Sequence, residues 1–206
     1  MPEQATSEVK PKRAFWVVLA SLLWATDAPF RKPITDQGMA STAIVFLEHV
    51  FSALVSLPLA WKQLPLVKRF DKADWLSLLF IGAGGSALGL VLFTQSFSYG
   101  NPTVTILIQK LQPIIAVVLA AAVLRERITR RFVVLAAVAL LASYFLAFGD
   151  ATYGPPLVEL AQPGTWLAPF GSIGSAPTVA AGLALGAAIL WGGSTVFGRR
   201  LASRYP

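Results

Sequence analysis

Apolar residues along the chain gather into six long runs, and short polar segments separate them. About 20 helical residues cross a hydrocarbon core of roughly 30 Å, and each run is close to that length. Uninterrupted apolar runs lack the alternation of a half-buried strand, and a membrane interior demands internally satisfied backbone. The pattern therefore predicts an all-α polytopic membrane protein, with spans at Phe15–Ile34, Ala40–Trp61, Trp75–Tyr99, Val104–Leu124, Phe132–Gly149 and Val179–Phe197.

The first run resembles a secretory signal, because Lys10, Lys12 and Arg13 precede it. It continues past Trp24, however, without a small-residue cleavage site. We therefore interpret it as an uncleaved first transmembrane helix.

Basic residues are distributed unevenly among the connections. Fourteen of the 17 lysines and arginines fall in the N-terminal tail, the second and fourth connections and the C-terminal tail, which share one side of the membrane if every run spans it. The first connection holds two, Arg31 and Lys32, and the last basic residue, Lys110, lies within a run. Because cytoplasmic loops are enriched in lysine and arginine, both tails are predicted to be cytoplasmic.

A weak internal repeat relates the first run to the sixth. Segment Ala20–Phe30 parallels segment Ala187–Phe197. Four spans lie between the copies, so the two helices cross the membrane in opposite directions. Inverted repeats of this kind are typical of secondary transporters. The residues that coincide are Ala20, Leu23, Trp24 and Phe30 with Ala187, Leu190, Trp191 and Phe197.

Composition narrows the function classes. The chain is 55% hydrophobic and 13% charged, whereas soluble domains carry about 25% charged residues. Its net charge of +7 lies in blocks between spans, which indicates insertion topology rather than nucleic-acid binding. With no cysteine and one histidine, disulfides, thiolate metal sites and a cysteine nucleophile are excluded, and no cofactor is expected.

Charged side chains within the runs are the candidate functional residues. A charge at the centre of a membrane helix costs roughly 2.5–3.5 kcal/mol on insertion scales. From the rise of a helix, Asp27, Glu48 and Lys110 all lie roughly 10 Å below the outer face, with His49 beside Glu48. This common layer predicts a polar cavity for substrate or coupling ion. The cavity set also includes Trp24, Gln109 and Gln112.

Each of these residues has a structural alternative. Lys110 can snorkel to the outer face, an escape that the shorter Asp27 lacks. Glu48 is either a functional acid or a structural partner of Lys110, and His49 either a proton relay or an interhelical hydrogen-bonding group. The glutamines can equally join helices, and Trp24 can simply pack.

Glycine and proline add two expectations. Gly82–Ala87 imitates a dinucleotide-binding loop, but it lies in an apolar span without a strand–turn–helix context. Gly85 and Gly89, four residues apart, favour close helix packing instead. Pro29 and Pro113 remove backbone hydrogen bonds and are expected to kink their helices.

The middle of the chain, Gly82–Thr129, resembles the EamA-type permeases of the drug/metabolite transporter superfamily. The likeness lies in the glycine-rich third span, the short turn after it, Leu-Gln-Pro (residues 111–113) and the closing Glu-Arg-Ile-Thr (residues 126–129). The resemblance implies two five-helix repeats, ten helices in all, that move small metabolites by alternating access.

On this resemblance the chain divides into four parts, of which the last is the truncated start of a second repeat. They are a cytoplasmic tail (1–14), a first five-helix repeat (15–149), an external linker or, alternatively, a lid (150–178), and the first helix of the second repeat (179–206).

The sequence therefore predicts a permease that moves small metabolites, amino acids or drugs across the cell membrane, in a bacterium the inner membrane, in the direction of export. The lipid bilayer and a small-molecule substrate are its expected partners. One alternative is a truncated remnant or a subunit, completed by a homodimer or by the missing second-repeat helices. A membrane-embedded enzyme is the least favoured alternative.

Overall fold

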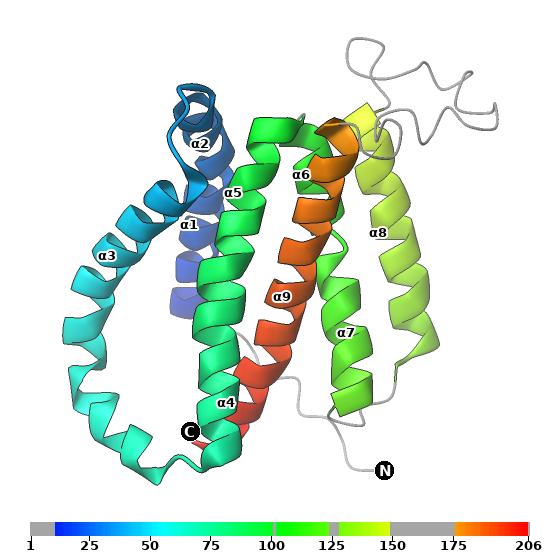
Figure 1. Cartoon of the computed structure of the whole chain (residues 1–206). Coiled ribbons are helices and arrows are strands. Elements are labelled where there is room, and N and C mark those ends of the chain that lie inside the picture. Colours follow the sequence, from blue (N-terminus) through cyan, green and yellow to red (C-terminus); the bar gives the residue numbers. More distant parts are fainter. Residues whose placement is uncertain (1–10, 101, 124–127, 149–175, 206) are drawn as a thin grey trace.

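The computed structural model describes residues 11–100, 102–123, 128–148 and 176–205, and in these ranges every regular element is a helix. Most helices stand side by side as a bundle (Figure 1). In chain order they are α1 (Pro11–Ala25), α2 (Asp27–Asp36), α3 (Ser41–Ala60), the 3₁₀ helix η1 (Trp61–Arg69), α4 (Lys72–Leu79), the π-helix η2 (Phe80–Gly89), α5 (Leu90–Tyr99), α6 (Pro102–Gln109), α7 (Gln112–Val123), α8 (Arg130–Phe148) and α9 (Ala176–Arg204).

The helical membrane architecture predicted from the apolar runs is confirmed. Within the described ranges, four helical stretches are long and apolar enough to cross a membrane. They coincide with the second, third, fourth and sixth predicted spans, and α8 coincides with the fifth. The four stretches are Ser41–Arg69, Lys72–Tyr99, Pro102–Val123 and Ala176–Arg204. Most of the predicted tail and linker lies outside the described residues.

The first predicted span forms two helices rather than one, because α1 ends at Ala25 and α2 begins at Asp27. A proline ring clashes with the carbonyl four residues earlier, and for Pro29 that carbonyl belongs to Ala25. The amide and the hydroxyl of Thr26 both donate to the Leu23 carbonyl, at 3.2 and 2.7 Å, which closes the last turn of α1. The interruption expected at Pro29 is therefore confirmed.

The fourth predicted span is broken by the same geometry. The carbonyl that Pro113 blocks belongs to Gln109, the last residue of α6. The amides of Lys110 and Leu111 turn back to carbonyls three residues earlier, each at 3.0 Å, before α7 begins at Gln112. Both breaks place polar residues beside backbone groups that have left the regular helical ladder.

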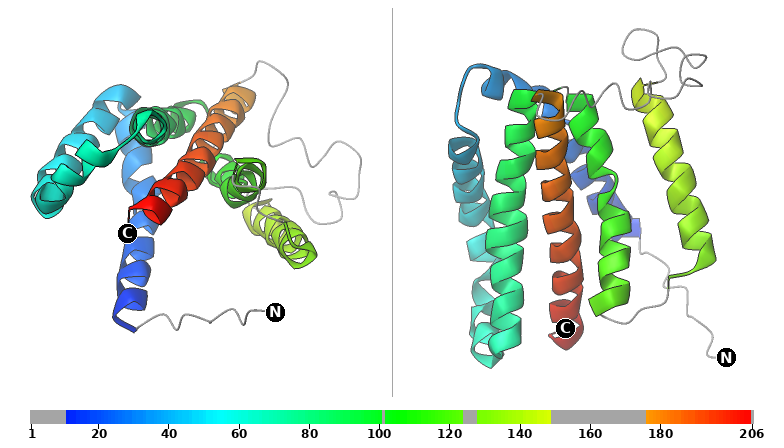
Figure 2. Two further views of the ribbon diagram at one scale, coloured as in Figure 1. Left: turned by 90° about the horizontal axis from the view of Figure 1, so that it is seen from below. Right: turned by 45° about the vertical axis from the view of Figure 1, so that its right-hand side comes forward.

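Helix α9 lies between the other long helices. It contacts η2 and α5 on one side and α6 and α7 on the other. Viewed along the bundle, α3 and α8 flank it on opposite sides (Figure 2). This central place follows from its small residues, because close helix packing in membranes needs a stripe of alanine and glycine. The buried small residues of α9 are Ala180, Ala184, Ala187, Ala188, Gly192 and Gly193.

Glycines on η2 allow α9 to approach closely. A Cβ built on Gly85 would lie 1.8 Å from the Ser194 hydroxyl, and one on Gly89 would lie 3.0 Å from Trp191 Nε1. The interpretation of this segment as a packing surface, and not as a nucleotide-binding loop, is confirmed. The apolar pattern of this span does not predict the π-helical geometry of η2. The Gly85 carbonyl within it accepts a 2.9 Å hydrogen bond from the Trp191 indole.

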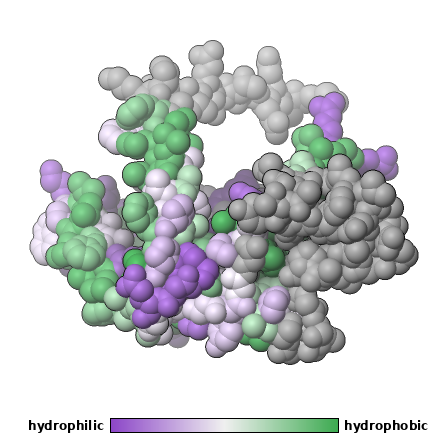
Figure 3. All heavy atoms as spheres, turned by 90° about the horizontal axis from the view of Figure 1, so that it is seen from above, coloured by the Kyte–Doolittle hydropathy of each residue, from purple (hydrophilic) through white to green (hydrophobic). Residues whose placement is uncertain are grey.

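The outer sides of the bundle are apolar. Phe46 and Leu54 on α3 and Val134 on α8 are all exposed, together with many other large hydrophobic residues. Seen from above, hydrophobic residues form several green patches among paler and hydrophilic residues (Figure 3). Water would disfavour so much exposed apolar surface, whereas lipid tails accommodate it.

Candidate functional site

Both helix breaks open onto one cavity of about 720 Å³. We call it the break cavity. Asp27, in the first turn of α2, and Lys110, in the turn between α6 and α7, lie on its wall, so two of the three predicted charges share it. Its lining residues are Val17, Ala20, Ser21, Trp24, Ala25, Asp27, Ala28, Phe93, Ile106, Gln109 and Lys110.

A second cavity of about 580 Å³ adjoins the first, because Trp24 and Gln109 line both. We call it the amide cavity, since Gln109 and Gln112 both border it. Its described lining contains no charged residue and draws on α1, η2, α6, α7 and α9. The lining residues are Trp24, Ile81, Gly85, Ser86, Gln109, Gln112, Trp191, Ser194 and Thr195.

The predicted acids are held by Arg31, a residue outside the predicted set. Its guanidinium forms two hydrogen bonds with the Asp27 carboxylate, at 2.6 and 2.8 Å. The same group lies 2.7 Å from Glu48 Oε1 and donates to the Thr94 hydroxyl at 2.6 Å. It also stacks 5.9 Å from the Phe93 ring centroid. Arg31 is 5% exposed, so two carboxylates share one buried cation.

Lys110 is not the ion-pair partner of Glu48, which was one of the alternatives for these two residues. It is exposed, and within the described residues it forms no ion pair with Asp27 or Glu48. Glu48 pairs with Arg31 instead and lines neither cavity. Asp27 therefore belongs both to the group of side chains around Arg31 and to the lining of the break cavity. Lys110 adds a separate charge to this cavity, from the break between α6 and α7.

The sequence contained one usable signal for Arg31. Asp27 and Arg31 are four residues apart, so they share a helix face and can pair. Arg31 was assigned to the first connection between spans, so its pairing with Asp27 was not expected. The contacts with Glu48 and Thr94 join α2 to α3 and α5. They depend on tertiary packing, which leaves no local pattern.

In this conformation the His49 ring acts as an interhelical hydrogen-bonding group, the structural alternative to a proton relay. Its Nδ1 lies 2.8 Å from the Val45 carbonyl, which can only accept, so this nitrogen is assigned the proton. Its Nε2 lies 2.9 Å from the Ser86 hydroxyl and in the neutral ring accepts from it. The ring thus joins α3 to η2, and it lines neither cavity.

Two tryptophans meet at the junction of the cavities. The rings of Trp24 and Trp191 pack edge to face, with centroids 6.2 Å apart and planes at 74°. These are the tryptophans that coincide in the internal repeat. Trp191 is fixed further by its bond to Gly85 and by the Phe93 ring, whose centroid is 5.2 Å away. The wall of the amide cavity therefore combines residues of α1 and α9.

The described ranges contain no cluster of three histidine, cysteine, aspartate or glutamate side chains that would suit a metal ion. The chemistry that this part of the chain offers is instead recognition by carboxylate, ammonium, amide and indole groups.

Comparison with known proteins decides the family. Residues 12–148 match the model of the EamA-like transporter family. The chain belongs to this family. The predicted resemblance is therefore confirmed, and the family and the apolar helices support a membrane transporter.

Two relatives illustrate how far the likeness extends. The chain is 28% identical over 141 residues to the riboflavin transporter ImpX of Fusobacterium nucleatum. The matched segment is 66% of this chain and 47% of ImpX. It is 29% identical over 115 residues to the uncharacterized inner membrane transporter YhbE of Escherichia coli, covering 55% of this chain and 36% of YhbE. The match thus spans less than half of each relative. No solved structure matches the chain.

Proposed function

We propose that this EamA-family protein moves small organic solutes across the cell membrane by alternating access, through the break cavity and the amide cavity. The observation that supports this most is the meeting of the two cavities at Trp24 and Gln109, between helices of both repeat copies. Binding sites of secondary transporters lie at repeat interfaces beside discontinuous helices. Here the breaks at Thr26 and at Lys110–Leu111 supply that feature.

In this proposal the two breaks act as hinges, and α9 is the element against which the first repeat rocks. Asp27 meets the solute or a proton, because its carboxylate borders the cavity while Arg31 fixes its position. Two carboxylates and one guanidinium leave the cluster one negative charge when all are ionised. A cationic group or a proton can therefore compete for Asp27. Lys110 provides the complementary charge for an acidic group.

We also propose an orientation, a membrane and a substrate class for this protein. In this proposal both tails face the cytoplasm, because most basic residues lie on their side of the membrane. The membrane is the bacterial inner membrane, because YhbE is named as an inner membrane transporter. Metabolites, amino acids and drugs are the substrate classes, and export is the direction. Riboflavin is a specific candidate, because it is the solute in the name of ImpX.

A second candidate is that this chain forms one part of a transport unit, completed by another copy or by helices equivalent to a second repeat. The exposed apolar faces of α1 and α3 and the coverage of less than half of each relative favour it. If it is correct, reconstituted chain alone gives no solute flux, and co-expression with the missing helices restores flux.

The test is solute flux in proteoliposomes containing equal amounts of inserted protein, with labelled riboflavin and amino acids as solutes. Asp27→Asn and Lys110→Met should lower the initial rate on the order of ten- to hundredfold, because they remove charges that position the solute. Asp36→Asn and Lys68→Met are matched controls outside both cavities and should leave the rate unchanged. Unaltered flux in both cavity variants would remove these residues from the mechanism.

A further inference from the structure

The amide cavity differs chemically from the break cavity beside it. Its described lining offers two glutamines, a threonine, two serines and two tryptophans, and it contains no acid or base. A charged solute group would find no counterion there, and burying an uncompensated charge is costly. The cavity of about 580 Å³ also falls within the usual range of roughly 300–1,000 Å³ for small-molecule sites. Its own chemistry therefore favours an uncharged group.

The two glutamines are available to a ligand. Gln109 ends α6 and Gln112 begins α7, so the helix break sets their amides beside one cavity. Neither side chain hydrogen-bonds to another described residue, so they do not join helices as interhelical amides do. Each amide presents a carbonyl acceptor next to an N–H donor. An unpaired amide at membrane depth is unfavourable, so a solute that pairs with it is stabilised.

The tryptophans define the shape of that solute. Trp24 and Trp191 both border the cavity, and their edge-to-face contact sets two aromatic planes at 74°. The Trp191 indole N–H is already engaged by the Gly85 carbonyl, so this side chain offers mainly its ring. Flat aromatic walls favour flat ligands, because ring faces stack with planar π systems.

We propose that the amide cavity binds the uncharged planar heterocyclic part of the solute, with Gln109 and Gln112 pairing to adjacent donor and acceptor atoms on its edge. One of the two indoles, Trp24 or Trp191, lies against a face of the ring, and the other, nearly perpendicular to it, borders another edge. This rests on the proposed transport function and names the substrate class. Glutamine amides recognise such an edge on nucleic-acid bases by two parallel hydrogen bonds. Cyclic imides and lactams within flat rings present the same pattern.

The first experiment compares ligands on the unaltered 206-residue protein in detergent micelles. Equilibrium dialysis measures binding of labelled uracil and, separately, of riboflavin, with empty micelles as the blank. Both rings carry an uncharged imide edge, whereas methyl groups block it in 1,3-dimethyluracil. We expect saturable binding of both ligands, competition by 1,3-dimethyluracil that is about tenfold weaker than by uracil, and no competition by lysine or glutamate.

The second experiment changes the amides one at a time. Gln109→Leu and Gln112→Leu should each weaken binding of uracil about tenfold, because an edge atom of the ring loses its partner. Gln95→Leu on α5 is the matched control, since Gln95 also lacks a partner among the described residues but lines neither cavity. It should leave the affinity within about twofold. Trp191→Phe should weaken binding less than the amide variants, because an aromatic face remains.

The results separate this inference from the transport proposal. It is overturned if neither ring binds saturably, if 1,3-dimethyluracil competes as well as uracil, or if Gln95→Leu weakens binding as much as Gln112→Leu. Flux of other solutes that depends on Asp27, without binding of either ring, would overturn the inference alone. Binding of a ring that requires both glutamines, without flux of any solute, would overturn transport by this chain and leave the site standing.

Discussion

Two arginines, Arg31 on α2 and Arg204 at the end of α9, each bridge a pair of carboxylates. Helix α2 and the C-terminal end of α9 lie at opposite ends of the bundle (Figure 1). Arg31 is buried, and one of its acids, Asp27, is only four residues away in the same helix. The side chain of Arg204 is 43% exposed, and its acids lie about 130 residues earlier in the chain.

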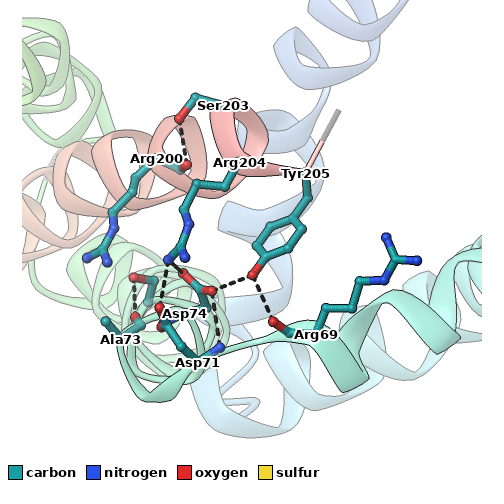
Figure 4. A network of polar contacts seen from close by, with 9 residues as sticks. Arg69, Asp71, Ala73, Asp74, Arg200, Ser203, Arg204 and Tyr205 are labelled. Atoms are coloured by element: carbon teal, nitrogen blue, oxygen red, sulfur yellow. Dashed lines mark hydrogen bonds and ion pairs between the residues drawn. The ribbon is translucent and has the colours of Figure 1, made fainter.

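The Arg204 cluster ties the end of α9 to the start of α4. The guanidinium lies 2.9 Å from Asp71 and 2.6 Å from Asp74, and the neighbouring Tyr205 hydroxyl donates to Asp74 at 2.6 Å (Figure 4). The same hydroxyl lies 3.1 Å from the Arg69 carbonyl. Asp71 and Asp74 also cap α4 reciprocally, since each side chain accepts the backbone N–H of the other.

The two clusters differ in how strongly water screens their charges. Around Arg31 little water competes, so removal of the cation leaves two acids without a compensating charge. Around Arg204 water and salt screen the charges, and the cluster holds a contact that can open at modest cost. We interpret the Arg31 cluster as a fixed framework for Asp27 and the Arg204 cluster as a releasable latch between the start of α4 and the end of α9.

The largest expected effect is that of Arg31→Leu. Loss of the guanidinium should lower the free energy of unfolding by about 3 kcal/mol, because Asp27 and Glu48 lose their shared partner. Denaturant titration in micelles, followed by circular dichroism, measures it. Arg31→Leu combined with Glu48→Gln should recover part of the loss. No recovery would mean that uncompensated charge is not the cause.

Asp74→Asn should have the next largest effect. Asp74 is fully buried and its carboxylate accepts hydrogen bonds from Arg204, Tyr205 and the Asp71 backbone. Loss of its charge should lower the free energy of unfolding by about 2 kcal/mol, since charge-assisted bonds become neutral ones. The same titration measures it. A loss as large as that of Arg31→Leu would contradict the distinction between framework and latch.

Acid should weaken the latch through Asp71. The Arg204 guanidinium and the Asp74 amide hold the pKa of Asp71 below its ordinary value. A lowered carboxyl pKa stabilises the fold above the unfolded value, about 3.9, and that contribution is lost as pH falls through the lower folded value. Relative to the intrinsic rate of unfolded amides at the same pH, hydrogen exchange at the start of α4 should therefore accelerate below about pH 4. Asp71→Asn should show fast exchange at every pH.

Alkali should act on the latch through Tyr205. The hydrogen bond to Asp74 and burial raise the pKa of the Tyr205 phenol. Its stabilising contribution is present below the unfolded value, about 10, and is lost as pH rises through the higher folded value. Ultraviolet titration of tyrosinate checks the shift. Tyr205→Phe should remove the last titration step, and an unchanged curve would assign that step to another tyrosine.

The smallest expected effect is that of Lys32→Ala. Lys32 forms a salt bridge with Asp36 at the same four-residue spacing as Asp27 and Arg31, but its side chain is 32% exposed and that of Asp36 is 53% exposed. Its removal should change the free energy of unfolding by no more than about 0.5 kcal/mol. Denaturant titration beside Arg31→Leu gives the comparison. A change of similar size in both variants would show that burial does not set the strength of these pairs.

Only some residues of the candidate site could be predicted from the sequence. Asp27, Lys110, Trp24 and Gln109 were expected in one cavity, and they line one. Glu48 and His49 were expected beside them, but their side chains contact Arg31 and Ser86 instead. Depth along a helix can be counted from the sequence. The direction in which a side chain meets a neighbouring helix cannot.

The sequence by itself determined the membrane helices, the family and the two breaks. Apolar runs of spanning length and the clash of a proline with the carbonyl four residues earlier are local properties of the chain. Only the tertiary structure decided that Arg31 holds both acids, that Trp191 meets Trp24, and that Arg204 reaches Asp74. Those contacts join residues up to about 170 positions apart, and the packing of α9 among the other helices brings them together.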